Sequence, residues 1–144
     1  MDGHNGDCVN SVVISSDNNL IVSGGDDHKI IVWNAISGYK IRTLEGHTDW
    51  VLSVTMSLDE KRIVSGDLEN IIIVWNLESG KIEKRLMGHT DYVYSVILSS
   101  NNNELISGES TKVTFWNIET SEITKIIELD NYICDSLSLW KIVF

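Results

Sequence analysis

The sequence predicts an all-β fold built from three similar units that follow one another along the chain. A Gly-His pair opens each unit and a Trp-Asn pair stands near its end, so that Trp33, Trp75 and Trp116 are 42 and 41 residues apart. Valine and isoleucine are abundant whereas alanine is nearly absent, a composition that favours strands over helices. Short apolar runs alternate with clusters of Gly, Asn, Asp and Ser, which is the pattern of strands joined by tight turns.

The first unit spans residues 3–45 and divides into four short runs of strand-forming residues. Polar turns separate these runs, including the Gly-Asp-Asp-His segment at 25–28 and the Ser-Gly pair at 37–38. The expected strands are residues 9–15, 20–24, 29–34 and 39–44.

The second unit (46–87) and the third (88–128) repeat this arrangement. The nearly continuous apolar run at 71–75 predicts a strand that is buried on both faces. The run at 81–86 is mostly charged, as expected of an outer edge that stays soluble and resists pairing with another chain. The expected strands are 51–57, 62–66, 71–76 and 81–86 in the second unit, and 93–99, 104–108, 112–117 and 122–127 in the third.

Residues 129–144 depart from the repeat. Asn131-Tyr132-Ile133 is similar to Asp91-Tyr92-Val93, which opens the third unit's first strand, but no Gly-His pair precedes it. Two interpretations remain open: a divergent or truncated fourth repeat that supplies one strand, or a terminal tail specific to this protein.

Because Gly-His, Ser-Gly and Trp-Asn recur together at matched offsets over residues 3–128, the sequence resembles the WD-repeat β-propeller family. The resemblance implies a partial propeller of three four-stranded antiparallel blades, too few to close alone. It also implies a buried hydrogen-bond chain of His, Ser, Asp and Trp in each blade. The matching residues are His4, Ser23, Asp27 and Trp33 in the first repeat, His47, Ser65 and Trp75 in the second, and His89, Ser107 and Trp116 in the third.

The second and third repeats differ from the family pattern at the carboxylate of the hydrogen-bond chain. Glu69 stands where aspartate is usual in repeat two, and Ser110 stands there in repeat three. We therefore expect the last two blades to be less tightly fixed than the first.

Closure is the structural problem of a three-bladed array, because propellers typically need four to eight blades. A single chain is expected to expose an apolar face on the first blade and another on the third, and patches of that size normally mark an interface. Three solutions remain open. Two copies form a six-bladed ring, the blades complete another protein's open propeller, or the chain is a fragment or truncated paralogue.

The sequence contains no pattern typical of catalysis, of a metal site or of a cofactor site. The histidines His4, His47 and His89 occupy equivalent corners of different blades, whereas a zinc ion needs its ligands around one point. The net charge of −10 argues against nucleic acid and against an anionic membrane as partners. We expect a non-enzymatic protein without cofactor or metal.

The remaining candidate for function is the surface. In the family, partners usually dock at the end that carries the loops entering each inner strand, and aromatic residues are common binding hot spots. The matching candidates are Trp50, Tyr92, Tyr94, Leu52, Leu68 and Asp26. The alternative for the rings is that they only fill space beside the central channel.

The expected function is therefore a protein–protein interaction scaffold or adaptor, cytoplasmic or nuclear, with unidentified protein partners. The alternative is a structural fragment or truncated paralogue whose blade faces serve only oligomer assembly. The two widely spaced cysteines, Cys8 and Cys134, fit a reducing compartment.

Overall fold

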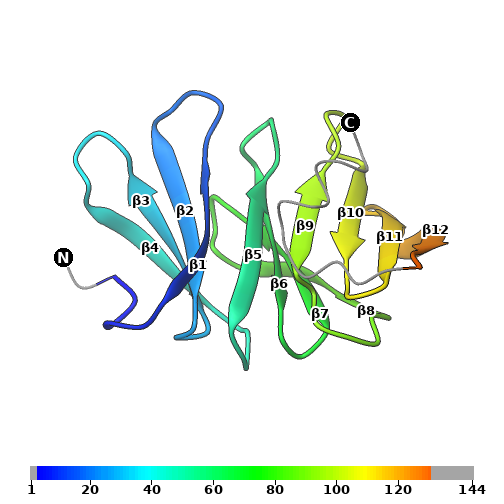
Figure 1. Ribbon diagram of the computed structural model, residues 1–144. Helices are drawn as coiled ribbons and strands as arrows, with labels where there is room; N and C mark the ends of the chain where they lie inside the picture. Colours follow the sequence, from blue (N-terminus) through cyan, green and yellow to red (C-terminus); the bar gives the residue numbers. More distant parts are fainter. Residues whose placement is uncertain (1–2, 131–144) are drawn as a thin grey trace.

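The computed structural model describes residues 3–130, which form three separate four-stranded antiparallel sheets and, within that range, no helix (Figure 1). Blade one contains β1 (Val9–Ile14), β2 (Leu20–Gly25), β3 (Lys29–Asn34) and β4 (Lys40–Glu45). Blade two contains β5 (Val51–Met56), β6 (Arg62–Asp67), β7 (Ile71–Asn76) and β8 (Ile82–Met87). Blade three contains β9 (Ser95–Leu98), β10 (Glu104–Gly108), β11 (Lys112–Asn117) and β12 (Glu122–Glu128). The all-β prediction is confirmed.

Within each blade the strands are paired in sequence order, and the three blades stand side by side along the chain (Figure 1). The central strands are the most buried, and β7 is covered over four of its six residues. The outer strands β4, β8 and β12 are largely exposed. This gradient agrees with the charged outer edge expected from the sequence.

Blade three begins its first strand later than expected, at Ser95 rather than at residue 93. The cause is that Val93 directs its N–H to the carbonyl of Asp67 on blade two, and Tyr94 donates to the carbonyl of Gly108. These two bonds replace the start of the regular ladder. The expected divergent fourth repeat, residues 129–144, lies outside the described residues apart from Leu129 and Asp130.

Two apolar clusters hold neighbouring blades together. Between blades one and two the buried side chains are Val22, Ile30, Val32, Leu44, Val51, Val54, Met56, Ile63, Ile73 and Trp75. Between blades two and three they are Val64, Ile72, Val74, Leu86, Val93, Val96, Leu105, Trp116 and Ile118. Each cluster joins one blade to the first three strands of the next, so the core lies between the blades.

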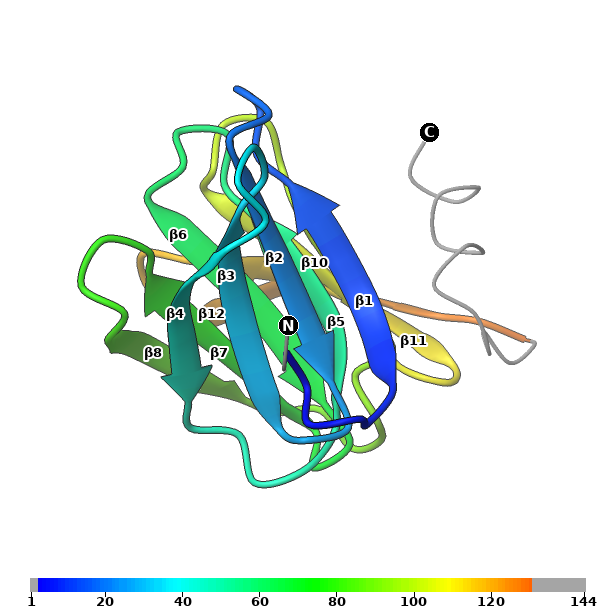
Figure 2. The same ribbon diagram turned by 90° about the vertical axis from the view of Figure 1, so that its left-hand side faces the viewer.

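Within residues 3–130 no blade packs on the outer side of blade one, and this free face is turned toward the viewer in Figure 2. On this face Val9, Val12 and Ile14 are 50%, 61% and 52% exposed. The residues at the same positions of blade two, Val51, Val54 and Met56, are 0%, 5% and 8% exposed. The expected open face of blade one is therefore present.

The free face of blade three is better covered than expected. Ile106 and Val113 are buried there, and Ile97, Phe115, Ile127 and Leu129 pack against them. Leu129 is fixed at this edge because its N–H donates to the carbonyl of Thr111 at 2.8 Å. The two ends of the array thus differ, with a broadly exposed apolar face only on blade one among the residues described.

Candidate functional site

A histidine, a serine and a tryptophan are linked in every blade. The imidazole Nε2 lies 2.8, 2.6 and 2.7 Å from the serine Oγ in blades one, two and three. The indole N–H donates to the same oxygen at 2.9, 2.8 and 2.7 Å. The chains are His4–Ser23–Trp33, His47–Ser65–Trp75 and His89–Ser107–Trp116.

The direction of these bonds follows from the donor inventory. An indole nitrogen only donates, so the serine oxygen accepts from it, and the serine O–H donates a hydrogen bond to Nε2 of the histidine. A neutral imidazole that accepts at Nε2 carries its proton on Nδ1. Each chain therefore ends in an Nδ1–H that needs an acceptor.

In blade one that acceptor is Asp27, whose Oδ1 lies 2.7 Å from Nδ1 of His4. The same oxygen accepts from the N–H of Lys29 and fixes the β2–β3 turn. The position two residues earlier must be small, because a Cβ on Gly25 would lie 2.9 Å from His4 Nδ1 and 2.5 Å from the carbonyl oxygen of Cys8.

In blade two the acceptor is Asp67, not Glu69. The buried Asp67 places Oδ2 2.5 Å from Nδ1 of His47, and its Oδ1 accepts from the N–H groups of Glu69 and Ile71 at 3.0 and 2.9 Å. Asp67 occupies the position that corresponds to Gly25. Glu69 is exposed and instead accepts a hydrogen bond from the hydroxyl of Thr48. The expectation that Glu69 supplies the carboxylate of blade two is wrong, and the reason given for a less tightly fixed blade two is removed.

In blade three the carboxylate again comes from the earlier position, as Glu109, and not from the turn at Ser110. Glu109 is buried, but its Oε2 lies 3.6 Å from Nδ1 of His89 and accepts from the N–H groups of Thr90 and Asp91, both at 2.9 Å. The carboxylate of the longer glutamate side chain thus bonds to the loop at Thr90 and Asp91, and His89 Nδ1 has no hydrogen-bond partner. Of the three chains, this one is the least completely bonded.

Burial of His89 lowers its pKa below the usual 6.5, an effect only partly offset by Glu109. Because the pKa of His89 is lower in the folded chain, His89 of the unfolded chain is protonated first as the pH falls through 6.5. The contribution of His89 to the free energy of unfolding is therefore complete above that pH and decreases below it.

We expect the free energy of unfolding to fall by about 1 kcal/mol between pH 7.5 and 5.5 because of His89 alone. Urea unfolding at both pH values, for the wild type and for His89→Gln, measures this contribution as the difference between the two pH dependences. Identical pH dependences in the two proteins contradict the expectation.

The six candidate docking residues lie at one end of the blades, where β1, β5 and β9 begin (bottom of Figure 1). Trp50 and Tyr92 are 45% and 44% exposed at equivalent positions of blades two and three. Tyr94 packs edge-on against Tyr92, with ring centroids 5.9 Å apart. Leu52, Leu68 and Tyr94 are half-buried. Their role in docking stays a prediction.

Each of the two exposed aromatics follows an aspartate that fixes its backbone. Asp49 Oδ1 accepts from the N–H of Trp50 at 2.7 Å, and Asp91 Oδ1 accepts from the N–H of Tyr92 at 2.8 Å. The carbonyl of Trp50 in turn accepts from the N–H of Leu68. Hydrogen bonds thus fix the two loops that carry the rings, and a carboxylate lies next to each ring in the sequence.

Asp26 is engaged within the molecule. Its Oδ1 accepts from the side-chain amide of Asn10 at 2.7 Å, and that amide also donates to the carbonyl of Val51 on blade two. Leu68, at the corresponding turn position of blade two, is half-buried. The accessible part of this end therefore centres on Trp50 and Tyr92.

Sequence reasoning missed Asp67 as the partner of His47 and Glu109 as the carboxylate beside His89. A signal was present, because both acids directly follow the Ser-Gly pair where repeat one has Gly25. For cofactor and metal chemistry, residues 3–130 contain no group of three or more His, Cys, Asp or Glu side chains placed to hold an ion. The same range contains no helix that could cross a membrane.

Comparison with known proteins agrees with this geometry. A family model described as "WD domain, G-beta repeat" matches residues 1–34, 38–76 and 80–117, which is well over half of the chain. Two solved structures, "Structure of U3-55K" and "Crystal structure of RRP9 WD40 repeats", each align with a TM-score of 0.85 at 24% identity. Each alignment covers 90% of this chain but 42% of the other, and at this identity it shows the fold alone.

Curated relatives match over single repeats. The chain is 46% identical over 41 residues to "Probable serine/threonine-protein kinase PkwA" of Thermomonospora curvata, covering 28% of this chain and 6% of that protein. It is 47% identical over 36 residues to "Nuclear distribution protein PAC1" of Arthroderma otae, covering 25% of this chain and 8% of that protein. The chain thus aligns with less than a tenth of the length of these relatives.

Proposed function

The chain belongs to the WD-repeat family, whose members generally act as scaffolds for protein–protein interaction, and on that premise we propose a specific docking site. The site is the end of blades two and three that presents Trp50 and Tyr92, and its ligand is a protein segment. No catalytic step is assigned to it. The proposal rests mainly on one observation: two large aromatic side chains, each nearly half exposed, stand at equivalent positions of adjacent blades.

The chemistry of the site suggests what kind of segment it takes. Aromatic rings supply much of the binding energy at protein interfaces. Asp49 and Asp91 place a carboxylate next to each ring, and the whole chain carries a net charge of −10. Nucleic acid and anionic lipid are disfavoured by this charge, whereas lysine and arginine are attracted by it. The segment is therefore one that combines a basic residue with an apolar anchor.

We place the protein in the cytoplasm or nucleus. Cys8 is an exposed free thiol, which fits a reducing compartment. One relative is named a nuclear distribution protein, which agrees with an intracellular site of action.

Replacing Trp50 or Tyr92 with alanine is expected to weaken capture of such a segment by about 30-fold, the effect of losing one interface hot spot. Peptides selected on the wild-type protein from a displayed library supply the probe, and their affinities for each variant are measured by fluorescence anisotropy. Tyr39→Ala is the matched control, because Tyr39 is 71% exposed but lies before β4, away from the docking residues.

Peptides that bind the wild type, Trp50→Ala and Tyr92→Ala equally well would show that the rings are not the docking site. A selection without basic residues would contradict the role given to the two aspartates.

A second candidate function, assembly alone, is favoured by the exposed face of blade one. It predicts that Trp50→Ala and Tyr92→Ala leave every interaction of the protein unchanged. The two candidates are therefore separated by the same variants.

A further inference from the structure

The loop that carries Tyr92 is fixed by a carboxylate from inside blade three. Glu109 is buried, and its Oε2 accepts from the backbone N–H groups of Thr90 and Asp91, both at 2.9 Å. Asp91 in turn accepts from the N–H of Tyr92 at 2.8 Å and from the hydroxyl of Ser110. One buried acid thus reaches the exposed ring through two successive contacts with the backbone.

Blade two has an acid at the same position, but that acid has a different role. Asp67 places Oδ2 2.5 Å from Nδ1 of His47, and its Oδ1 accepts from two N–H groups of the following turn. Within residues 3–130, no carboxylate accepts from the N–H groups of Thr48 and Asp49 in the loop that carries Trp50. The acid of blade two therefore fixes the buried histidine and not the docking loop.

The difference between the two acids is one methylene group. Glu109 Oε2 lies 3.6 Å from Nδ1 of His89, and among the described residues this nitrogen has no hydrogen-bond partner. A buried donor without an acceptor is unfavourable, so the histidine gains nothing from the longer side chain. The loop does gain, because the extra length carries the carboxylate to its two amides.

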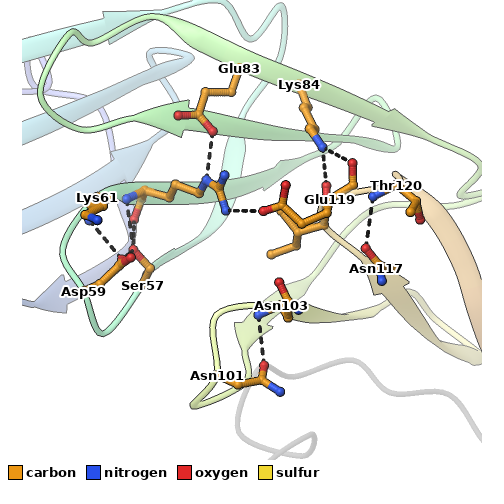
Figure 3. Close-up of polar contacts among 12 residues, drawn as sticks. Ser57, Asp59, Lys61, Glu83, Lys84, Asn101, Asn103, Asn117, Glu119 and Thr120 are labelled. Carbon is orange, nitrogen blue, oxygen red and sulfur yellow. Dashed lines mark hydrogen bonds and ion pairs between the residues drawn. The ribbon is translucent and has the colours of Figure 1, made fainter.

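The frame on which this loop stands is fixed separately. Arg62 of blade two donates to Glu83 at 2.9 Å and to Glu119 of blade three at 3.1 Å. Lys84 donates to the carbonyl of Glu119 at 2.6 Å (Figure 3). A buried apolar cluster also joins the two blades. The position of Tyr92 on this frame therefore depends on the bonds of its own loop.

We propose that Glu109 is a positioning residue of the docking end, which holds the backbone of Thr90 and Asp91 so that the Tyr92 ring has one orientation before a ligand binds. The inference rests on the docking function proposed above. A preorganised loop raises affinity because it does not have to be ordered on binding. The protein segment thus meets a fixed ring on blade three and a more adaptable ring, Trp50, on blade two.

Two substitutions separate the length of this side chain from its charge. Glu109→Asp keeps the charge and has the length found in blade two, whereas Glu109→Gln keeps the length and an oxygen that accepts from the loop. Amide hydrogen exchange of Thr90 and Asp91, followed by NMR, is expected to be about 10-fold faster in Glu109→Asp than in the wild type. Glu109→Gln should retain most of the protection.

Affinity and stability are expected to respond in different directions. Glu109→Asp should bind the peptides selected on the wild type about 10-fold more weakly. Its free energy of unfolding should not decrease, because the shorter carboxylate bonds to His89 as Asp67 does to His47. A purely structural acid would instead lower affinity and stability together. Glu104→Asp is the matched control: it shortens an exposed glutamate at the other end of β10 and should change neither quantity.

Unchanged exchange of the Thr90 and Asp91 amides in Glu109→Asp overturns the inference, and so does a loss of stability that accompanies the loss of affinity. If the amides lose protection and Tyr92→Ala binds weakly while Glu109→Asp binds normally, the docking site stands and the positioning role is wrong. If Trp50→Ala, Tyr92→Ala and Glu109→Asp all bind normally, the docking site itself is wrong and the inference fails with it.

Discussion

Replacing Asp67 with alanine is expected to lower the free energy of unfolding by about 3–5 kcal/mol, the range for removing one partner of a buried polar or ionic pair. Asp67 is fully buried and accepts three hydrogen bonds, from Nδ1–H of His47 and from two backbone N–H groups of the β6–β7 turn. Alanine leaves all three donors without an acceptor, and the site is closed to water. Urea unfolding followed by circular dichroism measures the loss.

Glu69→Ala is the matched control, because it removes a carboxylate from the same turn. The side chain of Glu69 is exposed, and among the described residues its carboxylate bonds only to the Thr48 hydroxyl, so its removal should change stability by less than about 0.5 kcal/mol. If Glu69→Ala costs as much as Asp67→Ala, the assignment of Asp67 as the partner of His47 is wrong.

Trp75→Ala is expected to cost about 3–5 kcal/mol, as is usual for a buried tryptophan. Its indole is 1% exposed, donates to Ser65 and packs against the ring of His47 with centroids 5.9 Å apart. It also lies in the cluster that joins blades one and two. The substitution therefore removes apolar burial and leaves Ser65 and His47 with an incomplete hydrogen-bond chain.

Trp33→Ala provides the comparison, since Trp33 makes the same bond to Ser23 but is only half-buried on the open blade. It should cost about 1–2 kcal/mol less than Trp75→Ala, because less apolar surface is lost. Equal losses contradict the difference in burial.

Much of the fold could be predicted from the sequence because the repeat fixes it three times over. The offsets from the Gly-His pair to Trp33, Trp75 and Trp116 place the strands within about two residues, and the count of blades predicts the open face at Val12. Covering of Val113 on blade three was not predicted, since it depends on side-chain packing around Leu129 rather than on blade number.

The partner of His47 could not be predicted from the residue offsets. Counting residues gives the position of each side chain along the strand, but it does not show which carboxylate reaches the imidazole. Counting back from Trp75 selects Glu69, which equals the offset of Asp27 from Trp33. The end of β6, however, directs the shorter Asp67 side chain at the imidazole, and Glu69 follows it into the exposed turn. For Glu109 the additional methylene moves the carboxylate toward the Thr90 and Asp91 amides instead.

The alternation between Asp27 and Asp67 has a consequence for how divergent copies of this repeat are recognised. A scoring profile that rewards only aspartate at the position of Asp27 will rank repeats two and three as degraded, although the imidazole of repeat two is held by a shorter contact than that of repeat one. Treating the two positions as interchangeable, with glycine required at the earlier one only when the later one is aspartate, describes repeats one and two by a single rule. Blades that simple consensus matching discards as decayed are then recovered as intact.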